Sequence, residues 1–335
     1  TQLAAIETAD IKALSTAALR ALNADQLSTL SAGQVAALSS SQVASLTADQ
    51  LAGLSTANLN AMGTALFAGL TSTQVAALTA AQVAKLETAD VAALGTAALK
   101  GLGADAIISL TTAQAAALTT AQLAAFSSAQ LSALETADIA ALSTANVKAL
   151  SNTALASLSA EQVGALGTAQ IAALSTSQIA ALKPDQVANM GTAAVAALSS
   201  SQVGVLTAAQ VAAMGTAQVA AIETADIKAL STAALRALGV DQITALGVAQ
   251  VAALTTTQVA ALSTLQMASL TTAELVALGT AQIAALNSTQ VEALTPEQVA
   301  KMEAADVAAL STAAIRGLGA DAMGVLTTAQ VAALT

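Results

Sequence analysis

Large apolar residues recur every eight residues along the whole chain. The series begins at Ile6 and continues through Leu14 to Leu334, and all 42 of its positions hold Leu, Ile, Met or Phe. We name this position a, so that the octad L-[ST]-T-A-Q-[VIL]-A-A runs from position a to position h. Position f also holds a large apolar residue, except at Ala115. The unbroken register predicts a single continuous octapeptide-repeat domain over residues 1–335.

An eight-residue period is compatible with three backbone arrangements. In one continuous α-helix, position a would drift around the helix by about 80° per octad and form no single apolar stripe. In an extended strand, positions a and f would lie on opposite faces, which makes a β-solenoid the weaker alternative. One short helix per octad keeps both apolar positions on one side. We therefore predict an all-α fold, a superhelical α-solenoid with one short capped helix per octad.

Capping signals agree with a helix that starts after position b. Position b is Ser, Thr or Asn in 26 octads and Gly in ten more, the residues that N-caps prefer. Gln at position e completes a capping box, as in Ser175-Thr176-Ser177-Gln178. Pro184 and Pro296 fall at position c, the first helical position, where proline is tolerated. Each octad is thus predicted to hold a helix of about six residues, with a bend at every a–b junction.

Helices this short are not stable alone in water, so neighbouring octads must pack together. Positions f and a are three residues apart and are predicted to form a continuous interior. Positions d and g, which carry 16 of the 30 charged residues, should face water, while Ala at positions d, g and h should let backbones approach closely.

An acidic cassette, Glu-Thr-Ala-Asp, recurs at irregular multiples of eight residues. It begins at Glu7, Glu87, Glu135 and Glu223, and a variant ends at Asp306. Two compatible explanations are open: the duplication of blocks of about 80 residues, and a superhelical turn of about five to six octads that would align the cassettes on one side. In both cases we expect the charged side chains to be solvated and to form weak ion pairs.

Composition excludes several partners and most catalytic chemistry. The net charge is −10, and the ten basic residues are scattered, which argues against binding nucleic acid. No apolar run approaches the ~18 residues of a membrane span, so we expect a chain that does not span a membrane. The sequence has no His, Cys, Trp or Tyr. Any general base would have to be Asp, Glu or Lys in a tuned pocket, and every carboxylate stands at a position explained by capping or exposure.

No sequence motif for binding calcium, phosphate or a dinucleotide is present. Paired carboxylates such as Glu7 and Asp10 are too few for a calcium site, and neither G-x-x-x-x-G-K nor G-x-G-x-x-G occurs. Phe67 and Phe126 stand at apolar repeat positions and are predicted to be core residues. We therefore expect no enzyme activity, no catalytic, cofactor-binding or metal-binding residues, and no cofactor.

The tandem [ST]-[ST]-A-Q-[VIL]-A-A-L units, plain in 166–182 and 246–262, resemble octapeptide arrays of very large bacterial exported proteins of the surface, adhesin or filament kind. The resemblance covers the entire chain. It implies a structural role at the cell surface or outside the cell, and it carries over no functional residues.

The two ends of the chain both fall inside an octad. Thr1 stands at position d and Thr335 at position b, so we expect a fragment of a longer repeat protein, with flanking repeats or with end-to-end or lateral association of copies of the chain. The expected function is a rod, filament or sheath at a bacterial surface. The alternatives are the spacer stalk of an adhesin and a scaffold that binds protein, glycan or ice on its Thr-rich face.

Overall fold

The computed structural model describes residues 2–334 and divides the chain into two compact units, Thr1–Leu166 and Gly167–Thr335. Both units consist of short helices, and no β-strand occurs between residues 2 and 334. The predicted all-α solenoid is therefore confirmed, and the β-solenoid alternative is wrong. The single continuous domain stays a prediction, and Thr1 and Thr335 lie outside the described residues.

The helices of the first unit follow one another at octad spacing. They are η1 Leu3–Ala5, η2 Asp10–Ala13, α1 Thr16–Ala21, α2 Ala24–Ser28, α3 Ala32–Ala36, α4 Ser40–Ser45, α5 Ala48–Ala52, α6 Thr56–Phe67, α7 Ser72–Ala76, α8 Ala80–Val83, α9 Thr88–Ala93, α10 Thr96–Leu99, α11 Ala104–Ile108, α12 Thr112–Ala117, α13 Thr120–Ala125, α14 Ser128–Ala133, α15 Thr136–Ala141, α16 Thr144–Ala149, α17 Asn152–Ser157 and α18 Ala160–Gly164.

The helices of the second unit have the same spacing. They are α19 Thr168–Ala172, α20 Thr176–Ala181, α21 Pro184–Ala188, α22 Thr192–Ala196, α23 Ser200–Val203, α24 Ala208–Ala213, α25 Thr216–Ala220, α26 Thr224–Ile227, α27 Thr232–Arg236, α28 Val240–Thr244, α29 Val248–Ala252, α30 Thr256–Ala261, α31 Thr264–Ser269, α32 Thr272–Val276, α33 Thr280–Ile283, α34 Ser288–Glu292, α35 Pro296–Lys301, α36 Ala304–Ala309, α37 Thr312–Ile315, α38 Ala320–Gly324 and α39 Thr328–Ala333.

The octad containing α20 shows how the sequence starts and ends each helix. Ser175 Oγ accepts a hydrogen bond from the Gln178 main-chain N–H at 3.2 Å, and Gln178 Oε1 accepts one from the Ser175 N–H at 2.8 Å. This pair is the predicted capping box. Leu182 at the next position a has extended backbone angles, φ −61° and ψ 143°, and turns the chain toward the next octad. Pro184 and Pro296 begin their helices, as predicted.

Positions a and f form the interior of both units, as predicted. Val211 at position f and Met214 at position a expose 0% and 4% of their surface. Positions b, c, d and g are mostly exposed, and position h is often half-buried. Position e differs from the expectation of a simple cap, because its glutamines other than Gln2 and Gln26 are buried nearly as deeply as the apolar residues.

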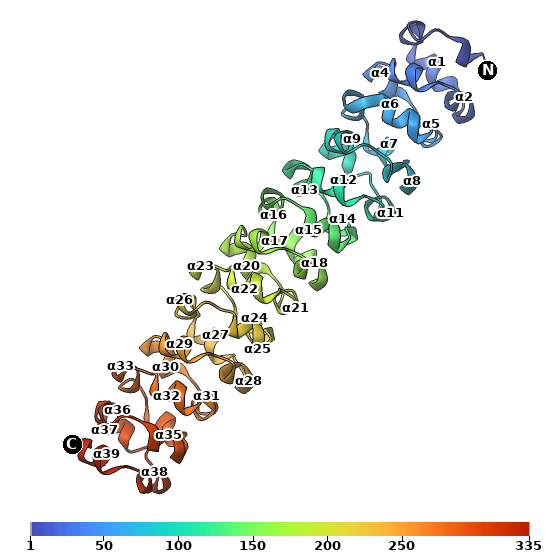
Figure 1. Cartoon of the computed structure of the whole chain (residues 1–335). Coiled ribbons are helices and arrows are strands. Elements are labelled where there is room, and N and C mark those ends of the chain that lie inside the picture. The colour runs from blue at the N-terminus through green and yellow to red at the C-terminus, as the bar shows by residue number, and fades with distance from the viewer. Residues whose placement is uncertain (1, 335) are drawn as a thin grey trace. The chain divides into compact units, whose positions relative to one another are not determined.

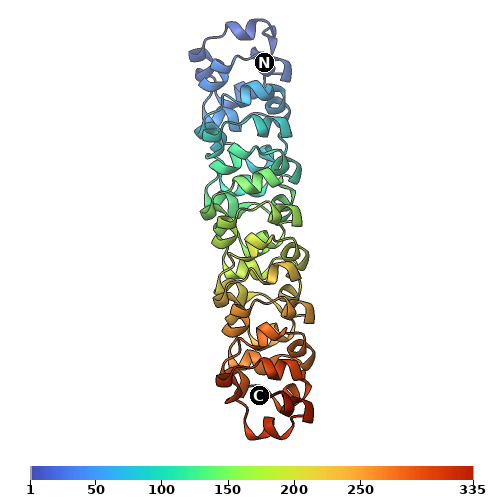
Figure 2. The ribbon, with the colours of Figure 1, turned by 90° about the vertical axis from the view of Figure 1, so that its left-hand side faces the viewer.

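Within each unit the helices wind into stacked turns around this interior (Figures 1 and 2). Helix α1 packs against α4, and α2 packs against α5. In addition, Gln50 on α5 donates hydrogen bonds to the carbonyls of Leu19 and Leu22, 31 and 28 residues earlier. Since 28 residues are 3.5 octads, one turn contains between three and four octads. The hypothesis of five to six octads per turn is therefore wrong.

One glycine departs from the regular bend between octads. Gly63 has φ +68° and ψ 167°, whereas the N-cap residues at position b of the α-helices have φ between −61° and −96°. A left-handed φ of this kind favours glycine, because it has no Cβ. At this point α6 spans two octads, with Gly63 as the kink between them.

A second glycine is required by close packing between turns. A Cβ added to Gly101 would lie 2.0 Å from the carbonyl oxygen of Ser72, 29 residues earlier. Gly317 meets the carbonyl of Ser288 in the same way. The predicted close backbone approach at position h is thus tightest at these two glycines.

Replacing Gly101 with alanine should destabilise the first unit by about 1–3 kcal/mol, because the added methyl group can fit only if a neighbouring turn shifts. Thermal unfolding followed by circular dichroism would show the lower midpoint. Gly103→Ser is the matched control, since nothing lies within 4 Å of an added Cβ there and the hydroxyl adds an N-cap. An equal loss in both variants would contradict the proposed close contact.

Candidate functional site

The buried glutamine at position e is the most specific polar feature of the fold. In the second unit, Gln210 Oε1 accepts the N–H of Thr207 at 2.8 Å, which completes its own helix cap. Its Nε2 donates to the carbonyls of Ile179 at 2.9 Å and Leu182 at 2.7 Å, which end helix α20. One amide therefore caps the start of one helix and the end of another helix one turn earlier. We call this recurring contact the glutamine ladder.

The ladder repeats through both units with the same separations. Its Nε2 groups donate to carbonyls 28 residues earlier and, in most cases, to carbonyls 31 residues earlier as well. The residues with these bonds are Gln34, Gln42, Gln50, Gln74, Gln82, Gln114, Gln122, Gln130 and Gln162 in the first unit and Gln202, Gln210, Gln218, Gln242, Gln250, Gln258, Gln266, Gln282, Gln290, Gln298 and Gln330 in the second.

Helix capping alone does not account for the residues at position e. The sequence itself indicates their second role as donors to the preceding turn. A capping box accepts Glu as well as Gln, and the helix dipole even favours the negative charge of Glu at the N-terminus. Position e nevertheless holds Gln 25 times and Glu only at Glu274. The preference for the amide indicates that its N–H groups are needed as donors.

Asparagine at position e forms a shorter version of the same contact. Asn58 Nδ2 donates to the carbonyl of Leu30 at 2.9 Å, and Asn146 Nδ2 donates to that of Leu118 at 2.8 Å, in each case 28 residues earlier. A side chain with one fewer methylene group therefore reaches the nearer carbonyl of the pair.

Four of the five aspartates at position e are buried, contrary to the expectation of solvated charges. Asp90 and Asp138 each expose 1% of their surface, Asp306 exposes 3%, and Asp226 exposes 6%. A carboxylate can accept hydrogen bonds but cannot donate one to a carbonyl. These four carboxylates thus stand at an interior position where glutamine supplies donors to the preceding turn.

The hydroxyl groups of position c offer some of these carboxylates a partner. Ser200 Oγ donates to Asp226 Oδ1, and the Thr112 hydroxyl bonds to Asp138. Asp90 has less support: among residues 2–334, its buried Oδ2 has no hydrogen-bond partner.

Burial shifts the ionisation of three of these groups. Desolvation, with a smaller contribution from the nearby Glu87 carboxylate, raises the pKa of Asp90 to about 6. Burial also raises the pKa of Asp138, against the opposing effect of its hydrogen bonds. For Asp306, burial and then the Glu303 carboxylate raise the pKa.

The acidic cassettes coincide with gaps in the ladder. Asp90 is followed at position e by Ala98 and Ala106, and the other cassettes likewise place Ala or Asn at position e of the following octad. We call these stretches ladder-poor segments; they extend over position-e residues 90–106, 138–154, 226–234 and 306–322. The longer period in the sequence therefore corresponds to places where fewer hydrogen bonds join successive turns.

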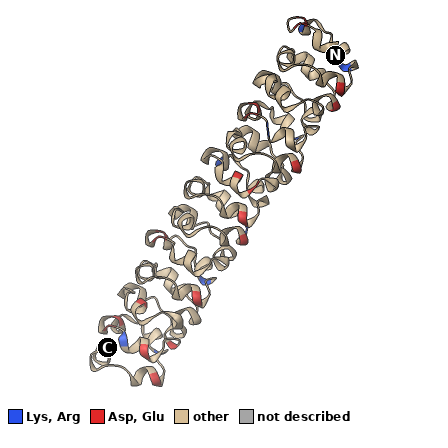
Figure 3. Ribbon diagram, turned by 45° about the vertical axis from the view of Figure 1, so that its right-hand side comes forward, with Lys and Arg blue, Asp and Glu red and all other residues tan. Residues whose placement is uncertain are grey.

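Carboxylates at position d form a separate, exposed set. They stand 24 or 56 residues apart within each unit, which is three or seven octads, or about one or two turns. Figure 3 shows acidic segments recurring along one side of each unit. The set comprises Asp25, Asp49, Asp105 and Glu161 in the first unit and Asp185, Asp241, Glu297 and Asp321 in the second.

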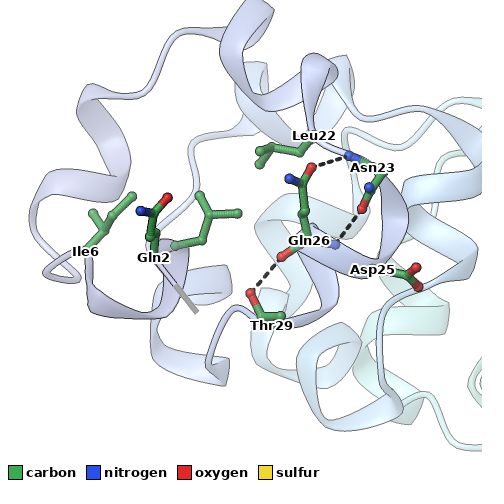
Figure 4. Close-up of a pocket in the computed structure, with 8 residues that line it drawn as sticks. Gln2, Ile6, Leu22, Asn23, Asp25, Gln26 and Thr29 are labelled. Carbon is green, nitrogen blue, oxygen red and sulfur yellow. Dashed lines mark hydrogen bonds between the residues drawn. The ribbon is translucent and has the colours of Figure 1, made fainter.

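A cavity of about 840 Å³ lies at the N-terminal end of the first unit (Figure 4). Its wall combines apolar Ile6 and Leu22 with the capping pair Asn23 and Gln26, whose side chains and backbones are hydrogen-bonded to each other. Asp25 is the ionisable residue of this wall. The lining offers no pairing of a nucleophile with a base.

The described residues include neither a carboxylate group suited to a metal ion nor a helix suited to a membrane. Between residues 2 and 334, no three carboxylates come together in a group that could hold a metal ion. In the same range, no helix has both the length and the apolar character that crossing a bilayer requires.

Comparison with known proteins identifies the repeat. No curated protein matches the chain. The profile of the ALTTAQ repeat matches in overlapping stretches that cover nearly all of it: residues 3–40, 51–86, 83–120, 116–144, 131–168, 164–192, 188–216, 219–256, 245–272, 268–303 and 299–335. The chain is thus a tandem array, and it belongs to the ALTTAQ repeat family.

Proposed function

We propose that the chain is a non-enzymatic structural element of a rod, filament or sheath at a bacterial cell surface. The observation that supports this proposal best is the glutamine ladder. Over most of each unit it joins successive turns by the same contact, so a unit can be extended by further octads without a change in its interior. A repeat of this kind provides length and regularity.

The absence of His, Cys, Trp and Tyr from the sequence is compatible with this role. The polar residues that recur most often cap helices or join turns, and the exposed carboxylates at position d lie on a solvated face. The surface location is supported by the resemblance to exported octapeptide arrays, and other copies of the same chain are the proposed partners.

Electron microscopy of the purified chain tests the proposal. Extended particles of uniform width are expected, whereas compact globular particles would overturn it. Fibres longer than one chain would support a filament or sheath, and separate short rods would support a spacer stalk. Labelling of intact source cells with an antibody against the chain should stain their surface. Staining only after the cells are opened would refute the surface location.

A further inference from the structure

The buried aspartates at position e stand where the fold otherwise places a hydrogen-bond donor. From the 28-residue separation of the ladder we expect Asp90 to face the carbonyl of Met62, Asp138 that of Leu110, and Asp306 that of Leu278. Asn58 and Asn146 donate to the equivalent carbonyls at 2.9 and 2.8 Å. A protonated aspartic acid has nearly the same shape as asparagine and carries one O–H donor, where the asparagine amide carries two N–H donors.

We propose that Asp90, Asp138 and Asp306 form the ladder contact only in acid, when their side chains are protonated. At neutral pH their carboxylates leave the opposite carbonyls without a donor. As the pH falls, each carboxyl group takes up a proton from water and donates it in a hydrogen bond to the preceding turn. Acid thereby tightens the fold in three of its ladder-poor segments. This proposal does not depend on the surface role proposed above.

Few other charges surround these groups. Asp90 lies on α9, which packs against α6 and α12, and neither of those helices carries a charged residue. Glu87, at the N-cap of α9, is the acidic residue that acts on it. No lysine or arginine on the packed helices compensates the buried carboxylate, so proton uptake is the direct way to remove its charge.

The other two sites have similar surroundings. Asp138 on α15 packs with α12, which is uncharged, and with α18, which carries the exposed Glu161; Glu135 is its own N-cap. Asp306 on α36 packs with α33 and α39, both uncharged, and has Glu303 at its N-cap.

The direction of the pH effect follows from the raised pKa of Asp90, about 6 against an ordinary value of 3.8. The folded chain binds this proton more tightly than the unfolded chain does. Stability around Asp90 should therefore be lowest above pH 6, rise as the pH falls through 6, and level off below about 4.

Hydrogen exchange of the whole chain, corrected for the intrinsic pH dependence of amide exchange, tests the proposal at pH 7.5 and pH 5. In the unmodified chain, exchange in α6 and α9 should slow by about tenfold on acidification. In the Asp90→Asn variant, these helices should already be protected at pH 7.5, and the change with pH should disappear.

The control is Asp105→Asn, which removes the same charge from the exposed position d of α11. It should leave the pH dependence of α6 and α9 unchanged. If Asp105→Asn removes the dependence as well as Asp90→Asn does, repulsion across the acidic chain is the cause and the proposal is wrong. A pH profile that Asp90→Asn does not alter would also overturn it.

Discussion

Replacing Gln210 with glutamate should weaken the contact between α20 and α24 by about 3 kcal/mol, or roughly a hundredfold in local opening. The glutamate side chain keeps the oxygen that caps α24, but it presents a carboxylate to the carbonyls of Ile179 and Leu182, which now accept from Nε2 at 2.9 and 2.7 Å. The carbonyl oxygens of Ile179 and Leu182 then lose their donor and face the negative charge of the carboxylate. Hydrogen exchange at pH 7 in the two helices measures the loss.

Two further variants separate the lost donor from the added charge. Ala209→Glu adds a carboxylate at the exposed neighbouring position d and should leave the exchange unchanged. Glu274→Gln restores the usual ladder residue at a buried position and should slow the exchange around α32. Equal destabilisation by Gln210→Glu and Ala209→Glu would show that the ladder bonds contribute little to stability.

Deleting the whole octad Leu254–Ala261 should leave the second unit folded, whereas deleting Thr257 alone should destabilise it by at least about 3 kcal/mol. Gln282 now donates to the carbonyl of Leu254. After removal of the octad it would meet the equivalent carbonyl of Leu246 at the same separation. The apolar positions a and f stay in register as well, so only one repeat is lost.

The single deletion has no such substitute. Gln258, Gln266 and Gln282 would each face carbonyls displaced by one residue, and three ladder contacts at about 1 kcal/mol each would be disturbed. The damaged octad would also lose either its cap or a residue of its helix. Thermal unfolding followed by circular dichroism should show a much larger decrease in midpoint for the single deletion, and similar decreases in the two variants would count against the octad register.

The helices and the interior could be predicted from the sequence because their causes are local. Ser175 and Gln178 are three residues apart, and their capping box needs no other part of the chain. The burial of Val211 and Met214 follows from their spacing in the repeat. Such features are encoded within one or two octads.

The number of octads per turn could not be predicted in the same way, because it depends on contacts between residues 28–31 positions apart. The charge cassettes suggested a longer turn, but they follow the spacing of ladder-poor segments. The burial of Asp90 was also missed, since aspartate at the third position of a helix has a sufficient explanation in the helix dipole. Its burial arises from the turn that packs over it.

The ladder has a consequence for how the protein folds during its synthesis. Its contacts join residues at most 31 positions apart within each unit, so the sequence distance over which order must form does not grow as octads are added. At a synthesis rate of about 5–20 residues per second, a new turn of 28 residues would emerge from the ribosome every ~1–6 s. Each turn could then close onto the completed one before it, and a nascent chain of any length would leave only its newest turn exposed to aggregation.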